Sequence, residues 1–124
     1  MPSRTLTACE AEVMNVVWTM ETATVQDVVN SIPRELAYTT VMTTMNILED
    51  KGYLKRAGKR GRAIVYRPLI SSEVASKSTL REFANRFFDG SVKSMVLSLV
   101  KSNQITADDL AELRNAIDAA EEAS

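Results

Sequence analysis

The 124-residue chain has no histidine and only one cysteine. Without histidine, no mechanism that needs a near-neutral imidazole is open to it. It also lacks a glycine-rich phosphate loop and a Cys/His cluster with metal-ligand spacing. Its adjacent carboxylates, Asp108–Asp109 and Glu121–Glu122, are typical of solvated helix ends rather than acid–base pairs. We therefore expect a protein that is not an enzyme, with no catalytic residue, cofactor or metal.

The single cysteine and the lack of long apolar runs bear on the compartment. Cys9 cannot form an internal disulfide, which fits a reducing environment. Its place on an apolar helical stripe favours a buried structural thiol over a nucleophile or ligand. The chain contains no run of about 18 apolar residues, so no membrane span is predicted. The N-terminus lacks the apolar core of a signal peptide. We therefore expect a cytoplasmic protein without a membrane partner.

Charge is unevenly distributed along the chain, although the net charge is only −1. Seven basic and no acidic residues lie between Lys51 and Arg67. From Ser71 to the C-terminus there are six basic and nine acidic residues. A locally basic module is therefore joined to an acidic one, a division that the net charge conceals.

Hydrophobic periodicity predicts three helices in the first half of the chain, over residues 7–20, 24–32 and 38–50. Thr7 with Glu10 suits a capping box, and Thr24 suits an N-cap. Pro33 ends the second helix, and Gly52 is a natural stop after the third.

The second half of the chain begins with a different pattern. Residues 54–67 predict a β-hairpin with a basic tip, with turn glycines at Gly58 and Gly61 and an end at Pro68. Three further helices are expected over residues 72–88, 92–101 and 107–121. The fold class is mainly α with a small β-hairpin, divided into residues 1–70 and 71–124.

Three helices followed by a basic hairpin are typical of a winged helix-turn-helix, in which the third helix enters the DNA major groove and the hairpin is the wing. With Val41, Met45 and Leu48 facing inward, Thr44 is expected to pack against the core. The outward residues are candidates for reading bases: Thr39, Thr40, Met42, Thr43 and Asn46. The alternative is that the threonines only pack or cap a tight helix N-terminus.

The hairpin and the residues before it supply the cations that DNA phosphates require. The candidate phosphate contacts are Lys51, Lys59, Arg60 and Arg62. Taken alone, the last three also fit an ordinary solvated turn; the absence of acidic residues from 51 to 67 favours phosphate contact. A membrane-surface role is disfavoured because no amphipathic apolar face adjoins the hairpin.

Several segments resemble one known family. They are "LTACEAEVMNVVW", "TVQDVV", "AYTTVMTTMNILEDKGYL", "GRAIVYRPL", "FFDGSVKSMVLSLV" and "LAELRNAID". Together they are similar to the penicillinase and methicillin-resistance repressors (the BlaI/MecI/CopY group) over essentially the whole chain. The resemblance implies a homodimeric repressor with an N-terminal winged helix and C-terminal dimerisation helices, bound to a dyad-symmetric operator. It also places the five outward residues at groove-facing positions, and Lys59, Arg60 and Arg62 in the wing.

The sequence departs from this family at two places. Members controlled by β-lactam-sensing membrane proteases are cut at an Asn–Phe bond, and the corresponding positions here are Ser98 and Leu99. This difference argues against induction by a sensor protease. Copper-responsive members carry a C-terminal Cys-x-Cys arrangement, whereas this chain has no cysteine after Cys9, which excludes copper sensing through such thiolates.

The C-terminal helices hold more apolar side chains than three helices can bury alone. Sharing them with a second copy would bury them, so we expect these residues to form the dimer interface: Phe83, Phe87, Phe88, Val96, Leu99, Val100, Leu110, Leu113 and Ile117. The alternative is a monomer whose helices fold back onto the winged domain. We predict a sequence-specific DNA-binding repressor; the rival is a winged-helix protein-interaction module without specific DNA binding.

Overall fold

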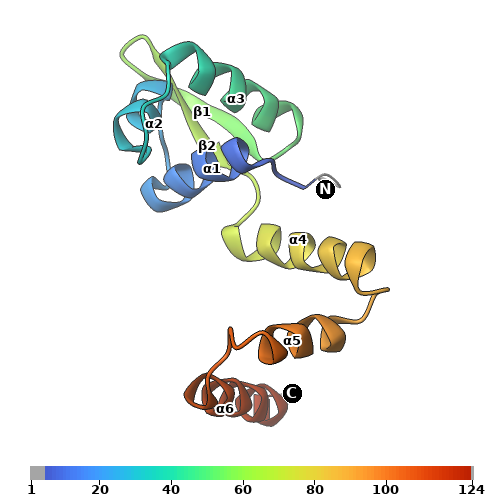
Figure 1. The fold of residues 1–124 in the computed structure, drawn as a ribbon. Coiled ribbons are helices and arrows are strands. Elements are labelled where there is room, and N and C mark those ends of the chain that lie inside the picture. The colour runs from blue at the N-terminus through green and yellow to red at the C-terminus, as the bar shows by residue number, and fades with distance from the viewer. Residues whose placement is uncertain (1–4, 124) are drawn as a thin grey trace. The chain divides into compact units, whose positions relative to one another are not determined.

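The computed structural model describes residues 5–123, which form six helices and one β-hairpin (Figure 1). The helices are α1 (Ala8–Met20), α2 (Val25–Ser31), α3 (Tyr38–Asp50), α4 (Ser72–Phe87), α5 (Val92–Lys101) and α6 (Ala107–Ala123); the strands are β1 (Leu54–Arg60) and β2 (Ala63–Pro68). This confirms the predicted mainly α fold with a small hairpin. The chain divides after Leu80, within α4, into two compact units. The division into residues 1–70 and 71–124 stays a prediction.

The helices begin where their capping residues place them. Thr7 and Glu10 form a reciprocal capping box at the start of α1, with N–H···O distances of 3.2 and 2.9 Å. Thr106 and Asp109 form another at α6, with both distances 3.0 Å. At the end of α3, Gly52 adopts a φ of +86°, a left-handed conformation that glycine enters without steric cost. These local signals explain why the predicted helix boundaries are close to the observed ones.

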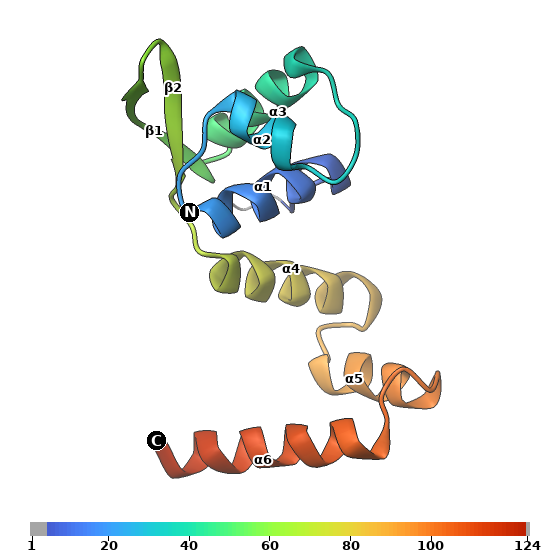
Figure 2. The ribbon, with the colours of Figure 1, turned by 90° about the vertical axis from the view of Figure 1, so that its left-hand side faces the viewer.

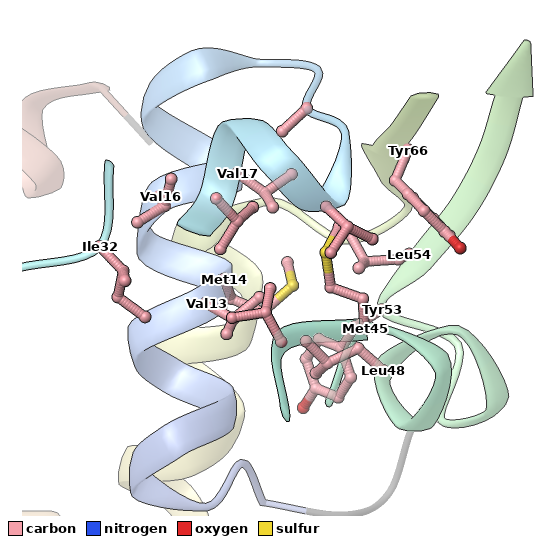
Figure 3. Packing of buried hydrophobic residues seen from close by; sticks show 14 of the residues in the cluster. Val13, Met14, Val16, Val17, Ile32, Met45, Leu48, Tyr53, Leu54 and Tyr66 are labelled. Atoms are coloured by element: carbon pink, nitrogen blue, oxygen red, sulfur yellow. The ribbon is translucent and has the colours of Figure 1, made fainter. Parts of the chain in front are cut away.

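The core of the first unit is built where α1 and α3 meet the base of the hairpin (Figure 3). Inaccessible side chains come from α1 (Val13, Met14, Val17), from α3 (Val41, Met45, Leu48) and, with 1% exposed, from β1 (Leu54). The predicted inward face of α3 is confirmed. In α1, Met14 is buried with its neighbour Val13, whereas Met20, at the end of the helix, is exposed.

The hairpin is anchored at its base and exposed at its tip (Figure 2). Ala23 and Tyr66 exchange two backbone hydrogen bonds of 3.0 and 2.8 Å, which form an isolated antiparallel β-bridge beside β2. Gly61 and Arg62 form the two-residue turn, and Gly61 has the positive φ that such a turn requires. The prediction that Gly58 is also a turn glycine was wrong: it lies inside β1, with φ +125°, where the pairing register shifts in a bulge.

The C-terminal helices leave most of their large apolar side chains exposed in the single chain. Phe83 contacts Phe87 and Phe88, with ring centroids 4.8 and 6.0 Å apart, yet Phe87 remains 64% exposed. Seven of the nine residues expected at a dimer interface are exposed, and Phe88 and Val100 are half-buried. No helix within residues 5–123 has the length and apolar character needed to cross a membrane.

One ion pair lies largely inside the first unit. Lys51 Nζ is 2.6 Å from Glu10 Oε1, and their side chains are only 14% and 7% exposed. Burial by itself raises the pKa of Glu10, but hydrogen bonds from Lys51 and the Thr7 N–H outweigh it, so the pKa is lowered from its ordinary value. The pair joins the first turn of α1 to the C-terminal end of α3.

We expect Glu10→Gln to lower the free energy of unfolding by about 2 kcal/mol at pH 7, because Lys51 would stay buried without its counter-charge. A carboxyl with a lowered folded-state pKa stabilises the fold above its unfolded pKa and loses that contribution as the pH falls through the folded one. The difference between wild type and Glu10→Gln should therefore shrink below pH 4.5. Urea unfolding from pH 7 to pH 3.5 measures it.

Glu73→Gln is the matched control for this experiment. Glu73 pairs with Lys77 at 3.2 Å, but both side chains are more than 70% exposed. This substitution should change stability little at either pH, because water screens exposed pairs. An equal loss in both variants would contradict a special role for the Glu10–Lys51 pair.

Candidate nucleic-acid interface

The outward face of α3 is polar and accessible. All five residues expected to read bases, Thr39, Thr40, Met42, Thr43 and Asn46, are exposed. Thr44 is 8% exposed, and its hydroxyl donates to the Thr40 carbonyl at 2.8 Å, which confirms its expected packing role. Cys9 Sγ lies 3.8 Å from the Thr44 hydroxyl, but Cys9 is only half-buried, so the expectation of a buried thiol was only partly right.

The N-terminus of α3 differs from those of the other helices. Its N-cap residue, Ala37, has no side chain that can accept an N–H, and the first turn holds no acidic residue. Each of the other five helices in residues 5–123 has a Ser or Thr hydroxyl that accepts an N–H of its first turn. The exposed start of α3 therefore keeps uncapped N–H groups and the positive end of the helix dipole, an arrangement that favours anions.

A hollow of about 230 Å³ lies between α3, the start of α2 and the hairpin. Tyr38, Met42 and Asn46 line it from α3, at spacings of four residues. Gln26 lines it from α2 and Arg62 from the hairpin turn. Tyr38 and Gln26 were not among the residues predicted from the sequence, although continuing the Met42–Asn46 spacing back by one helical turn leads to Tyr38.

The basic residues of the hairpin fall into two groups. Lys59 and Arg62 are exposed and make no ion pair within residues 5–123. Arg60 Nη1 lies 2.9 Å from Asp27 Oδ2. Arg56, not among the predicted contacts, pairs with Glu49 at 3.1 Å, and its guanidinium lies 5.9 Å from the centre of the Tyr66 ring. The tip is therefore strongly basic, although part of its charge is already neutralised.

Other predicted site residues are not among those that form this surface. Lys51 is the partner of Glu10 in the largely buried pair, so the structure gives it a packing role between α1 and α3. Ser98 and Leu99 are helical residues of α5, and their role as a cleavage position stays a prediction. Within residues 5–123, no group of three Cys, Asp or Glu side chains is placed to hold a metal ion.

Known structures share this fold. A mutant MarR from E. coli, solved in complex with operator DNA, superposes with a TM-score of 0.53, covering 93% of this chain and 75% of that one. Wild-type MarR in its apo form gives a TM-score of 0.54, covering 93% and 78% of the two chains. Sequence identity is 13% in both comparisons, so the likeness establishes a shared winged-helix fold and no more.

Proteins of similar sequence identify the family, which the structural likeness does not. The chain is 28% identical over 112 residues to the methicillin resistance regulatory protein MecI of Mammaliicoccus sciuri, covering 89% of this chain and 90% of MecI. It is 30% identical over 106 residues to the penicillinase repressor of Bacillus licheniformis, covering 84% and 82%. The family pattern described as penicillinase repressor matches residues 6–119. The relatives are named as a regulatory protein and a repressor, not as enzymes, in agreement with the prediction that the chain is not an enzyme. The chain belongs to the penicillinase repressor family.

Proposed function

We propose that this protein is a transcriptional repressor that binds a dyad-symmetric DNA operator as a homodimer. The observation that carries the proposal is the continuous surface formed by the exposed face of α3 and the basic hairpin tip, which meet at one hollow. A polar helix beside a cationic wing suits a major groove and its flanking phosphates. That E. coli MarR, which shares the fold, was solved with operator DNA adds support by analogy.

Base recognition is assigned to α3. Its exposed threonines are short, so the helix backbone can approach base edges, and their methyl groups can meet the thymine methyl. Asn46, exposed near the middle of the helix, has the donor and acceptor pair that adenine presents in the major groove. The same helix buries Val41, Met45 and Leu48, so these side chains project from a rigid element.

Phosphate contact is assigned to the hairpin tip and to the start of α3. Lys59 and Arg62 offer cations without a protein partner among the described residues, and Arg60 adds a third. The uncapped N–H groups that follow Ala37 offer backbone donors to a phosphate. Lys51 is left out of this set because it is paired and largely buried.

Dimer formation is assigned to the C-terminal helices. Phe83, Phe87, Leu113 and Ile117 are 45–64% exposed in the single chain, and a second copy would remove such side chains from water. One winged helix makes few phosphate contacts, and salt screens them. When two are linked in a dimer, binding of the second to its half-site becomes intramolecular, which raises affinity about 10²–10⁴-fold. A bound dimer then represses by occluding the promoter.

Two substitutions should separate base recognition from phosphate contact. Asn46→Ala should flatten the preference among duplex sequences, with a loss of about 1–3 kcal/mol confined to the operator. Arg62→Ala should weaken binding to all duplexes and make the slope of log K against log salt less negative by about 0.9 for each half-site. Titrations of fluorescent duplexes from the protein's own promoter region, at several salt concentrations, measure both. Wild-type affinity indifferent to salt and sequence would favour the protein-interaction module instead.

Capping α3 should stabilise the fold but weaken DNA binding. Ala37 has φ −64° and ψ 147°, close to the N-cap conformation of Thr7, so Ser or Asp fits there. Ala37→Asp should raise stability by about 1 kcal/mol while its carboxylate repels the phosphate. Ala37→Ser supplies the cap without the charge and should bind DNA more tightly than Ala37→Asp. Thermal unfolding and duplex titration test this pair; equal DNA affinities would contradict a phosphate at this helix end.

Disrupting the C-terminal apolar surface should abolish the avidity of the dimer. Phe87→Asp should yield monomers in sedimentation equilibrium and lower operator affinity about 10²–10⁴-fold. Phe87→Leu keeps an apolar side chain and should remain dimeric. If Phe87→Asp is monomeric in solution but binds the operator as tightly as wild type, occlusion by a dimer is wrong.

A further inference from the structure

The carboxylate of Asp27 joins the start of α2 to the hairpin tip. Its Oδ2 accepts a hydrogen bond from the Thr24 N–H at 3.0 Å and another from Arg60 Nη1 at 2.9 Å. Asp27 N–H in turn donates to the Thr24 hydroxyl at 3.1 Å, completing the capping box of α2. One oxygen therefore serves both a local helix cap and a contact between residues 33 positions apart.

This carboxylate is held in a fixed position. Thr24 is 4% exposed, and Val25 and Val28, which flank Asp27, are buried in the core of the first unit. The hydrogen bond from the Thr24 N–H, and to a lesser extent the one from Arg60, lower the pKa of Asp27 although desolvation by burial raises it. Asp27 is thus an ionised anchor on the rigid part of the fold, and its side chain is 24% exposed.

The hairpin tip has little other support. Beyond the bulge at Gly58, the residues from Lys59 to Ala63 are all exposed. A two-stranded hairpin is marginally stable in water without a packed face. Within residues 5–123, Arg60 is the one residue of this tip whose side chain makes an ion pair or hydrogen bond with another element.

We propose that Asp27 is a positioning residue for DNA binding, which holds Arg60 so that its guanidinium bridges the Asp27 carboxylate and a DNA phosphate. The proposal rests on the DNA-binding function proposed above. Arg60 uses only Nη1 for Asp27, and its side chain is 60% exposed, so most of its five N–H donors remain free. A wing already fixed beside α2 avoids part of the entropy cost of ordering it on the duplex.

The opposite arrangement, in which Asp27 withholds Arg60 from DNA, makes the opposite prediction. In that case, removing the Asp27 charge would release a cation and strengthen binding. The change of charge by itself would also strengthen DNA binding, because the protein loses a negative charge near the interface. A loss of affinity after neutralising Asp27 can therefore be explained by positioning but not by simple electrostatics.

The test uses Asp27→Asn, whose amide oxygen can still accept the Thr24 N–H. Its affinity for the promoter duplex should fall about threefold to tenfold, corresponding to one side chain ordered on binding. The salt slope should stay unchanged, because no phosphate contact is removed. Arg60→Met should weaken binding and also make the slope less negative by about 0.9 for each half-site. In the Arg60→Met background, Asp27→Asn should cause no further loss of affinity, because the side chain that it positions is gone.

Asp109→Asn is the matched control. Asp109 forms the same capping box with Thr106 at α6, so this variant has the same cap chemistry and the same change in net charge, away from the hairpin. It should bind duplex DNA like wild type. Thermal midpoints of the two Asn variants should agree, so that a binding defect is not a folding defect.

A measurement without DNA completes the test. Backbone ¹⁵N order parameters of Lys59 to Arg62 should fall in Asp27→Asn and Arg60→Met but not in Asp109→Asn. If Asp27→Asn binds as tightly as wild type or more tightly, or leaves these order parameters unchanged, the positioning role is wrong while the proposed function stands. If wild type shows no salt-dependent duplex binding, the proposed function fails and the positioning role in DNA binding fails with it.

Discussion

The burial of three α3 side chains against α1 and the hairpin base is the constraint on which the exposed surface of the first unit depends. Val41, Met45 and Leu48 are inaccessible, and re-exposing each would cost about 1.5–3 kcal/mol. Because a helix is rigid, fixing this inward face also fixes which residues face outward. The accessible position of Asn46 and its neighbours is therefore a consequence of core packing. A surface built in this way can present side chains in one geometry.

Ion pairs then decide how much of the basic segment remains available. Of the seven basic residues between positions 51 and 67, three are paired with carboxylates from other elements: Lys51, Arg56 and Arg60. Lys51 is nearly enclosed, whereas Arg60 is mostly exposed. A count of charges in the sequence consequently overstates the free positive charge. The positive charge at the tip that has no carboxylate partner among the described residues is on Lys59 and Arg62, and Arg62 lines the same hollow as the exposed face of α3.

The two units differ in how far they bury their apolar side chains. The first encloses its core residues, including five valines from α1 and α2, within a single chain. The second leaves Leu110, Leu113 and Ile117 of α6 exposed at spacings of three and four, the pattern of a helix–helix seam. A unit that is complete in one chain suits precise presentation of side chains. A unit that is incomplete alone suits association with a second copy, which is the role the proposed function assigns to it.

The sequence by itself determined the elements: all six helices, the hairpin, the caps at Thr7 and Thr24, and the inward and outward faces of α3 followed from patterns within a few residues. Such patterns are local, because periodicity and capping act over one or two helical turns. Only the tertiary structure decided that Lys51 binds Glu10, 41 positions away, and that Arg60 binds Asp27, 33 positions away. The pairing of charged side chains that are far apart in the sequence depends on how the elements pack, and no local sequence pattern specifies that pairing.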